Sequence, residues 1–395
     1  MTETTLSSLV VILAAVALAP MLADLISPVI RLPAVILEIL AGVLIGPALG
    51  WAEADDIINF LSALGLCTLM FLAGLEIDLQ RIRGGPLRRA LTGWGITFIA
   101  ALALGAFVAS VDGMADAQSG FLVGLAVTTT AFGILLPILH DSGELATRFG
   151  TEVLAGSAIG ELGPIVAIAV LFGSDAPGRT VLVLLAFVAV VILTSFLAHR
   201  ERNLRISRMI ETTLTTSGQV AIRLAVLFLA AMVWLASELG LDVLLGAFAA
   251  GMVTKLFAGG ANRRDVEMFE SKLDAIGFGF LVPLFFVVSG MKFDLDSVVD
   301  DPLILLIGPA FLVAFLVLRG IPAAFTTRPM PMRDRAALAF YLATQLPLVV
   351  VITSIGVETK RLDPSTAAAL VAAAMVSVLA YPMIGARLRR HGAAA

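Results

Sequence analysis

The sequence is nearly devoid of cysteine and histidine, two of the residues that commonly hold metals in soluble enzymes. Among its 395 residues there is one cysteine, Cys67, so neither an internal disulfide nor a cysteine-ligated metal can form. The three histidines, His140, His199 and His391, are widely spaced and make no metal-ligand motif. Charged residues are scarce as well, at 14% of the chain. We therefore expect no bound cofactor and no enzymatic activity.

Motifs that would supply energy or a conducting pore are also missing. The chain has no glycine loop of the GxxxxGK[ST] type, which argues against direct coupling to ATP. It has neither an arginine repeat of the voltage-sensor kind nor a glycine-rich potassium filter. No basic run precedes the first apolar segment, so we interpret that segment as a retained span rather than a signal peptide. If the chain moves a solute, an ion gradient must supply the energy.

The sequence is rich in apolar segments. Most of them are close in length to the ~20 residues that a helix needs to cross a bilayer. Hydrophobic residues make up 59% of the chain, and we predict an all-α membrane protein with 13 transmembrane helices. Because the loops are short, we predict a single membrane unit over 1–390, a short cytoplasmic tail over 391–395 and no soluble regulatory domain. The predicted segments are 5–23, 33–51, 57–75, 90–110, 118–139, 149–173, 180–198, 219–237, 241–257, 273–291, 302–326, 335–356 and 364–386.

Lysine and arginine are distributed unequally between alternate loops. With the N-terminus outside, the inside loops hold 20 of the 26 basic residues, the outside loops hold four, and the spans hold Arg223 and Arg319. Because basic residues accumulate on the cytoplasmic side, this split predicts an outside N-terminus and a cytoplasmic C-terminus. We expect a multi-pass protein of the inner (cytoplasmic) membrane.

Two stretches of the sequence resemble each other at a distance of seven segments. Residues 71–79 read FLAGLEIDL and residues 286–295 read FVVSGMKFDL. A fainter match relates Ala41-Gly42-Val43 to Ala250-Gly251-Met252. An odd offset makes the two copies run in opposite directions through the membrane. The pattern predicts two inverted six-helix repeats, 5–173 and 219–386, joined by a linker helix at 180–198.

Equivalent segments of the two repeats each combine polar side chains with a proline. Thr128 to Thr130 precede Pro137 in one segment, and Thr344-Gln345 precede Pro347 in the other. Proline cannot donate a hydrogen bond to the carbonyl four residues earlier. Free backbone groups at membrane depth are tolerated only where they line a cavity or meet a partner. We predict that both helices are discontinuous and cross in a core domain, although two ordinary proline kinks would give the same pattern.

Glu161 is the one acid in the apolar stretch 153–173. It lies about eight residues, hence roughly 12 Å, into a hydrocarbon core ~30 Å thick, where a carboxylate costs ~2.5 kcal/mol or more. Ser157 precedes it by one helical turn, and Pro164 leaves the carbonyl of Gly160 without its helical donor. These oxygens suit a partly dehydrated monovalent cation. Because burial favours the protonated carboxyl, a proton and a cation would compete for Glu161, unless this acid is merely paired with a buried arginine.

Further residues are candidates for supporting roles. Arg319, near the cytoplasmic end of its segment, either snorkels to the interface or stays buried and balances the charge of Glu161. Glu38, one turn into its segment, is either a possible second acid of the site or a helix-terminal charge. The candidate neutral ligands are Ser157, Thr129, Thr130 and Gln345.

Together these motifs resemble the monovalent cation:proton antiporter-2 family of the cation:proton antiporter superfamily, in the form of the Kef-type membrane domain of sodium/proton and potassium/proton exchangers. The similarity covers most of the chain and rests on 31–47, 71–78, 128–131 and 283–290. The resemblance implies a 13-helix fold, a dimerisation domain and a moving core domain with two crossed, unwound helices. It also implies elevator-type alternating access and a homodimer.

The resemblance further implies roles for single residues. In the family, the ion-binding acid is usually the second member of an acidic, Asn-Asp or Gln-Asp pair, and that place reads Gly160-Glu161 here. Glu161 would carry the exchange, and Arg319 matches the family's basic residue. The first acid, which often pairs with that basic residue, is absent. One titrating carboxylate implies one proton per cation, hence electroneutral exchange.

We therefore predict a secondary active antiporter that exchanges Na⁺ or K⁺ for H⁺ at Glu161, in a lipid bilayer and without a nucleic-acid partner. A sodium-coupled symporter of an organic anion, on a related inverted-repeat fold, is an alternative that would need a roomy polar pocket. A passive channel and a non-transporting sensor are further alternatives. Cavity radius, which decides between Na⁺ and K⁺, is not encoded in any of these motifs.

Overall fold

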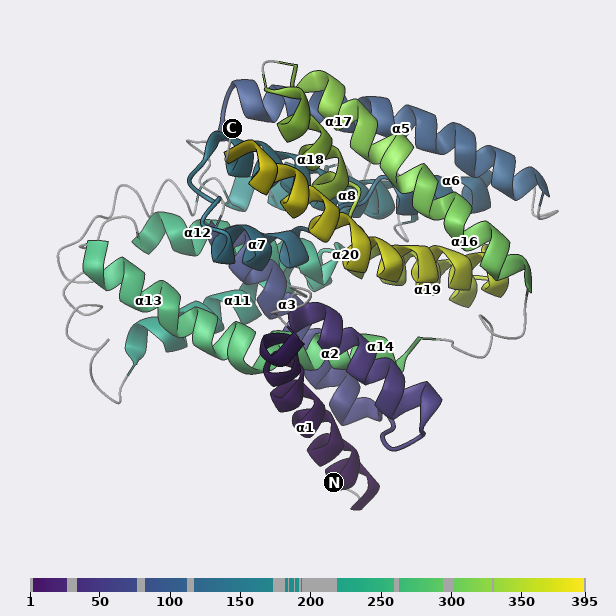
Figure 1. Ribbon diagram of the computed structural model, residues 1–395. Helices are drawn as coiled ribbons and strands as arrows, with labels where there is room; N and C mark the ends of the chain where they lie inside the picture. Colours follow the sequence, from purple (N-terminus) through teal and green to yellow (C-terminus); the bar gives the residue numbers. More distant parts are fainter. Residues whose placement is uncertain are drawn as a thin grey trace. The chain divides into compact units, whose positions relative to one another are not determined.

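The computed structural model is helical wherever it contains regular structure in the residues that it describes (Figure 1). Within these residues, ten helical segments are long and apolar enough to cross a membrane, and two further apolar helices are shorter. The prediction of an all-α membrane protein is thereby confirmed, whereas the number thirteen stays a prediction. The described residues are 3–26, 34–76, 82–111, 117–172, parts of 182–193, 219–258, 263–293, 302–328 and 330–393.

The described helices follow one another with short connections. In chain order they are α1 (Glu3–Ile26), α2 (Ala34–Val43), α3 (Asp56–Glu76), α5 (Gly85–Val111), α6 (Ala117–Val127), α7 (Phe132–Asp141), α8 (Arg148–Phe172), α11 (Val220–Glu238), α12 (Val243–Ala258), α13 (Arg263–Ile276), α14 (Val282–Met291), α16 (Pro302–Ala314), α17 (Ile321–Thr326), α18 (Met332–Leu342), α19 (Pro347–Glu358) and α20 (Pro364–Ala393).

Two helix ends extend well beyond the predicted segments. α13 begins at Arg263, inside a stretch that the sequence predicts to be a loop, because its many charged residues hide it from a search for apolar segments. α20 continues to Ala393, so most of the predicted tail 391–395 is helical. The predicted linker helix 180–198 lies largely outside the described residues.

Three apolar helices contain a π-helical turn. These turns are η1 (Leu44–Ala48), η2 (Gly277–Leu281) and η3 (Phe315–Gly320). π-Helical turns are rare and are found frequently at functional sites. η3 joins α16 to α17 and carries Arg319, one of the predicted site residues.

The chain divides into two compact units. The first comprises 1–16, 53–77 and 165–289, and the second comprises 17–52, 78–164 and 290–395. Each unit therefore draws on both predicted repeats. All of the predicted site residues, from Glu38 to Gln345, belong to the second unit.

In the first unit, α3 and α12 approach each other at two glycines of the repeated motifs. A Cβ atom on Gly74 would lie 2.1 Å from the carbonyl oxygen of Phe248, and one on Gly251 would lie 2.0 Å from that of Phe71. Because these neighbours are backbone atoms, they cannot yield as a side chain would. The close packing of α3 and α12 therefore requires glycine at both positions.

The second unit contains the matching contact. A Cβ atom on Gly290, in α14, would lie 2.1 Å from the carbonyl oxygen of Ile39 and 3.0 Å from the Cα atom of Gly42, both in α2. Gly290 is the motif partner of Gly74, and Gly42 is the motif partner of Gly251. The two copies of the motif thus make the same kind of glycine contact, each within its own unit.

We expect Gly251→Ala to lower the free energy of unfolding by about 1–3 kcal/mol, because the added methyl group forces the backbones of α3 and α12 apart. Gly95→Ala is the matched control. A Cβ atom on Gly95, in α5, meets no atom within 4 Å, so this substitution should be neutral or slightly stabilising. Melting temperatures in detergent measure both effects, and equal values for the two variants would contradict the contact.

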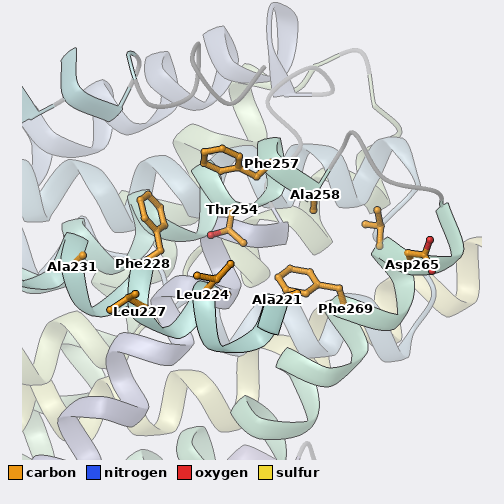
Figure 2. A pocket seen from close by; sticks show the side chains of 12 residues that line it. Ala221, Leu224, Leu227, Phe228, Ala231, Thr254, Phe257, Ala258, Asp265 and Phe269 are labelled. Atoms are coloured by element: carbon orange, nitrogen blue, oxygen red, sulfur yellow. The ribbon is translucent and has the colours of Figure 1, made fainter. Parts of the chain in front are cut away.

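A large apolar groove lies in the first unit, between α11, α12 and the start of α13 (Figure 2). Its volume is about 440 Å³, and its walls include Leu224, Phe228, Phe257 and Phe269. None of the predicted site residues lines it. Because it offers few oxygen atoms, which alkali and other hard cations require, the groove is no candidate for an ion site.

Candidate functional site

Two helices of the second unit are interrupted, as the sequence predicts. The first stops at Val127 (α6) and restarts at Phe132 (α7), and the second stops at Leu342 (α18) and restarts at Pro347 (α19). The second break lies at its proline, which opens α19. In the first helix the break falls at the threonines, and Pro137 lies within α7, so that proline did not locate the break.

Each break caps a helix end of the other. Gln345 of the second break donates from Nε2 to the carbonyl of Val127 (2.8 Å), at the C-terminus of α6. Thr130 of the first break donates from Oγ1 to the carbonyl of Leu342 (2.8 Å), at the C-terminus of α18. Carbonyls at a helix C-terminus have no intrahelical donor, and at membrane depth no bulk water replaces it. The crossing therefore stabilises two helix ends that would be costly alone.

The two breaks are also bonded directly. The amide of Ala131 donates to the carbonyl of Thr344 (2.8 Å). The hydroxyl of Thr129 donates to Oε1 of Gln345 (3.2 Å). These contacts join residues more than 200 positions apart, so the predicted meeting of the two interrupted helices is present in the structure.

Glu161, on α8, reaches the first of these breaks. It is 1% exposed, and its Oε2 accepts a hydrogen bond from the amide of Phe132 (3.1 Å), the first residue of α7. The carbonyl of Gly160, left without a helical donor by Pro164, accepts from the amide of Thr130 (3.2 Å). The carboxylate thus lies at the positive end of the α7 dipole, where a negative charge is stabilised.

Two oxygens one helical turn apart on α8 are left without a partner. Ser157 Oγ and Glu161 Oε1 are both buried, and neither has a hydrogen-bond partner among the described residues. Residues four apart on a helix share a face. Because buried polar atoms are nearly always hydrogen-bonded, this pair is the strongest candidate for a ligand site. No cluster of three or more His, Cys, Asp or Glu that would suit a multivalent metal is found in the described ranges.

Arg319 is turned into the protein. It is 1% exposed, its Nε donates to Thr130 Oγ1 (2.9 Å), and its Nη2 donates to the carbonyl of Gly156 (2.7 Å). The snorkelling alternative is therefore wrong, because these two internal acceptors hold the guanidinium. In the part of the chain that the structure describes, Arg319 makes no ion pair with a carboxylate. It contacts the neighbours of Glu161 rather than Glu161 itself.

The missing side chain at residue 160 explains this arrangement. A Cβ atom on Gly160 would lie 2.5 Å from Thr130 Oγ1 and 2.7 Å from Arg319 Nη2. The hydroxyl and the guanidinium therefore fill the space that an acid or amide at position 160 would enter. Arg319 binds the carbonyl of Gly156, one turn earlier on α8, where such a side chain is lacking.

The remaining predicted residues divide into two groups. The side chains of Thr129, Thr130 and Gln345 are engaged in the bonds that hold the crossing. Glu38, on α2, is buried, but it makes no hydrogen bond or ion pair with any described residue that would connect it to Glu161.

The sequence reasoning missed two residues of this region. Ser377, on α20, accepts a hydrogen bond from the amide of Gln345 (2.9 Å) and donates to its carbonyl (3.1 Å). Its signal was a lone hydroxyl in an alanine-rich apolar run. Glu152, near the start of α8, is buried and binds Arg89. Its signal was an acid just inside a predicted span.

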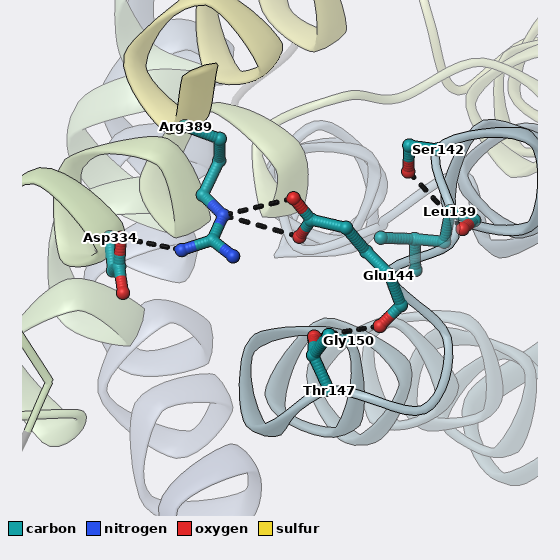
Figure 3. Close-up of polar contacts among 7 residues, drawn as sticks. All are labelled: Leu139, Ser142, Glu144, Thr147, Gly150, Asp334 and Arg389. Carbon is teal, nitrogen blue, oxygen red and sulfur yellow. Dashed lines mark hydrogen bonds and ion pairs between the residues drawn. The ribbon is translucent and has the colours of Figure 1, made fainter. Parts of the chain in front are cut away.

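A charged cluster fixes the start of α8 (Figure 3). Arg389 of α20 donates from Nε to both carboxylate oxygens of Glu144 (3.1 and 3.2 Å) and from Nη1 to Asp334 in α18 (2.7 Å). Thr147 caps the N-terminus of α8 by accepting a hydrogen bond from a backbone amide (3.0 Å). These contacts orient the helix that carries Glu161.

Comparison with known proteins decides the family. The sequence matches the family described as "Sodium/hydrogen exchanger, transmembrane" over residues 11–388, nearly its whole length. The chain belongs to this exchanger family. The resemblance to cation:proton antiporters, predicted from the motifs, is thereby confirmed.

Several relatives of this exchanger-family chain carry related names. The protein named "Putative Na(+)/H(+) antiporter YjbQ" of Bacillus subtilis is 30% identical over 99% of this chain and 64% of its own length. The Na(+)/H(+)-K(+) antiporter GerN of Bacillus cereus is 29% identical over 67% of either protein. Cation/H(+) antiporter 18 of Arabidopsis thaliana is 28% identical over 91% of this chain and 46% of its own length. The chain thus spans between about half and two thirds of the length of these relatives.

A solved structure shares the fold of this exchanger-family chain. The sodium proton antiporter MjNhaP1 from Methanocaldococcus jannaschii gives a TM-score of 0.64 over 98% of this chain and 97% of that chain. At 16% sequence identity, this likeness concerns the fold alone.

Proposed function

We propose that this exchanger-family chain is a secondary active antiporter that exchanges Na⁺ or K⁺ for H⁺. The observation that carries the proposal is the pair of buried, unpartnered oxygens Ser157 Oγ and Glu161 Oε1 at the crossing of two interrupted helices. Membership of the family supports cation/proton antiport, and so does the chain's similarity to GerN, a Na(+)/H(+)-K(+) antiporter. A carboxyl group removed from water suits a site that takes either a proton or a partly dehydrated cation.

In the proposed mechanism Glu161 alternately carries H⁺ and the cation. Its Oε2 keeps the amide hydrogen bond of Phe132, and its Oε1 is available to either ion. Ser157 is the nearest candidate neutral ligand. Thr129, Thr130 and Gln345 are further candidates, whose oxygens must serve without breaking the bonds that hold the crossing.

Arg319 is proposed to balance the charge of Glu161 when no cation is bound. A fixed positive charge near the site favours the ionised carboxylate after the proton leaves. Because one carboxylate exchanges one proton for one monovalent cation, the exchange is proposed to be electroneutral. Glu38 is retained only as a possible second acid of the site.

The architecture implied by the resemblance is part of the proposal. It comprises 13 spans in two inverted repeats, an outside N-terminus, a cytoplasmic C-terminus, location in the inner membrane, elevator-type alternating access and a homodimer. The glycine contacts of Gly74 with α12 and of Gly290 with α2 support the inverted repeats, because both copies of the motif make the same backbone contact. The crossed breaks support a core domain of the transporter type.

The organic-anion symporter gains no support from the described residues. The cavity beside Arg319 has a volume of about 10 Å³, room for about one water molecule. The groove of about 440 Å³ is apolar and contains none of the site residues. A symporter of this class would need a polar pocket that admits an organic solute.

Reconstitution into liposomes with an internal pH dye tests the proposed function. Adding Na⁺, K⁺ or Li⁺ outside should drive protons out and raise the internal pH, whereas choline should have no effect. An electroneutral exchanger should show the same rate with and without an imposed membrane potential. Uptake of a labelled organic anion under a sodium gradient, with no cation-driven proton movement, would favour the symporter.

A further inference from the structure

A second ion pair of the second unit lies close to Arg319. Arg89, near the start of α5, donates from Nε to Oε2 of Glu152 (3.2 Å) and from Nη2 to its Oε1. The side chain of Glu152 is 3% exposed and that of Arg89 is 26% exposed. Among the described residues, both hydrogen bonds of the Arg89 side chain end on Glu152. The pair thus consists of a buried acid and a partly exposed base that covers it.

A small cavity connects this pair to Arg319. Its lining includes Arg89, Glu152, Gly156, Arg319 and Thr327, and its volume is about 10 Å³, enough for about one water molecule. A guanidinium has three nitrogen donor positions. Nε and Nη2 of Arg319 are bonded, whereas Nη1 has no partner within the described residues. Arg319 therefore has a donor to spare for a water molecule in this cavity.

The residues on α8 that meet these two arginines share one face of the helix. Glu152, Gly156 and Gly160 are spaced by four residues, so each lies about 6 Å further along α8. Glu152 binds Arg89, the Gly156 carbonyl binds Arg319, and Gly160 abuts the guanidinium. The face leads from a partly exposed ion pair to the residue that precedes Glu161.

We propose that the Arg89–Glu152 ion pair is a latch that controls the access of water to this face of α8. The closed pair separates Arg319 from bulk water, and its opening admits water to the guanidinium. A charge acts strongly on its neighbours in dry surroundings and weakly beside water, so the latch sets how strongly Arg319 acts on Glu161. This last consequence rests on the proposed function, whereas the latch itself does not. In the predicted orientation the latch faces the cytoplasm, because Arg89 lies at the start of α5, just before the predicted span 90–110 and on its inside end.

The single cysteine makes the latch directly testable. In a Cys67→Ser background, Thr327→Cys places a thiol in the cavity wall, and its reaction with neutral iodoacetamide reports access of water-borne solutes. Thr327 is 3% exposed, so labelling should be slow while the latch is closed. Glu152→Gln removes the charge that holds Arg89, which can then extend into water. Labelling should become about tenfold faster, since ~1.4 kcal/mol of lost closure is a factor of ten in the open population.

Two matched controls separate a latch from general loosening. Thr353→Cys places the same thiol outside the cavity. Like Thr327, Thr353 is 3% exposed, and its hydroxyl donates a hydrogen bond to the carbonyl four residues earlier. Its labelling should not respond to Glu152→Gln. Glu144→Gln weakens a separate ion pair of the unit, with Arg389, whose side chains are 19% and 22% exposed, and should leave labelling of Thr327→Cys unchanged.

A further variant guards against a single substitution that fails to fold. The double variant Arg89→Gln/Glu152→Gln removes both charges, leaves no buried ion unpaired and should also accelerate labelling.

Unchanged labelling in folded Glu152→Gln protein, or equal acceleration at Thr353→Cys, would overturn the latch. Neither result depends on exchange activity. If the wild-type protein showed no cation-driven proton movement, the proposed function would be overturned, whereas the labelling result would stand.

Discussion

Replacing Glu161 by glutamine should reduce cation-driven proton movement in proteoliposomes to the level of empty vesicles. The side-chain amide of glutamine does not lose a proton in the pH range where the exchange is assayed, and it carries no negative charge to attract a cation. The fold should survive, because the amide oxygen of glutamine can still accept the hydrogen bond from Phe132. Loss of the charge at the α7 dipole should cost no more than about 2 kcal/mol of stability.

The same assay needs a control in which an acid is changed elsewhere. Glu238, at the exposed end of α11, is suitable, and Glu238→Gln should exchange at the wild-type rate. Glu161→Asp tests the geometry, because it keeps the carboxyl but shortens the side chain, and it should retain a reduced rate. Exchange by folded Glu161→Gln at the wild-type rate would remove Glu161 from the mechanism.

The second large effect is expected at Arg319. Arg319→Gln removes a buried charge together with its hydrogen bonds to Thr130 and Gly156. Hydrogen bonds to charged groups contribute ~1.5–3 kcal/mol each, so the free energy of unfolding should fall by about 3 kcal/mol or more. Exchange should also be lost, because the carboxylate of Glu161 would have no balancing charge after its proton leaves.

Arg319→Lys distinguishes the charge of Arg319 from its structural contacts. Lysine keeps the positive charge, but its single ammonium group lacks the planar fork that reaches two acceptors at once. We expect Arg319→Lys to be destabilised and yet to retain measurable exchange, unlike Arg319→Gln. The comparison combines thermal melting with the pH-dye assay at a temperature where both variants are folded. Equal exchange rates for the lysine and glutamine variants would show that the charge is not required.

The interruption of two helices could be predicted from residue types, whereas its placement could not. Polar side chains and a proline within an apolar run indicate a break, and both breaks are present. Pro347 marks its break, but Pro137 lies within α7, because the break at the threonines is stabilised by caps from Gln345 and Thr344. Those partners lie more than 200 residues away, so no local pattern contains them.

The fate of Arg319 illustrates the same limit. From the sequence, an arginine near the end of a span can equally snorkel outward or stay buried. The outcome depends on whether internal acceptors exist, and the structure supplies them at Thr130 and Gly156. Space for the guanidinium exists because residue 160 is glycine. The local sequence pattern identified Gly160 and Glu161 as candidates, but it could not predict that Arg319 packs against Gly160.

The sequence by itself determined that the chain is a helical membrane protein with one isolated acid, because hydrocarbon enforces apolar segments of fixed length and penalises every buried charge. Only the tertiary structure decided which oxygens are already satisfied. Thr129, Thr130 and Gln345 hold the crossing, while Ser157 Oγ and Glu161 Oε1 stay unpartnered among the described residues. Hydrogen bonds depend on distances of a few ångströms between remote segments, and these distances exist only after the helices have packed.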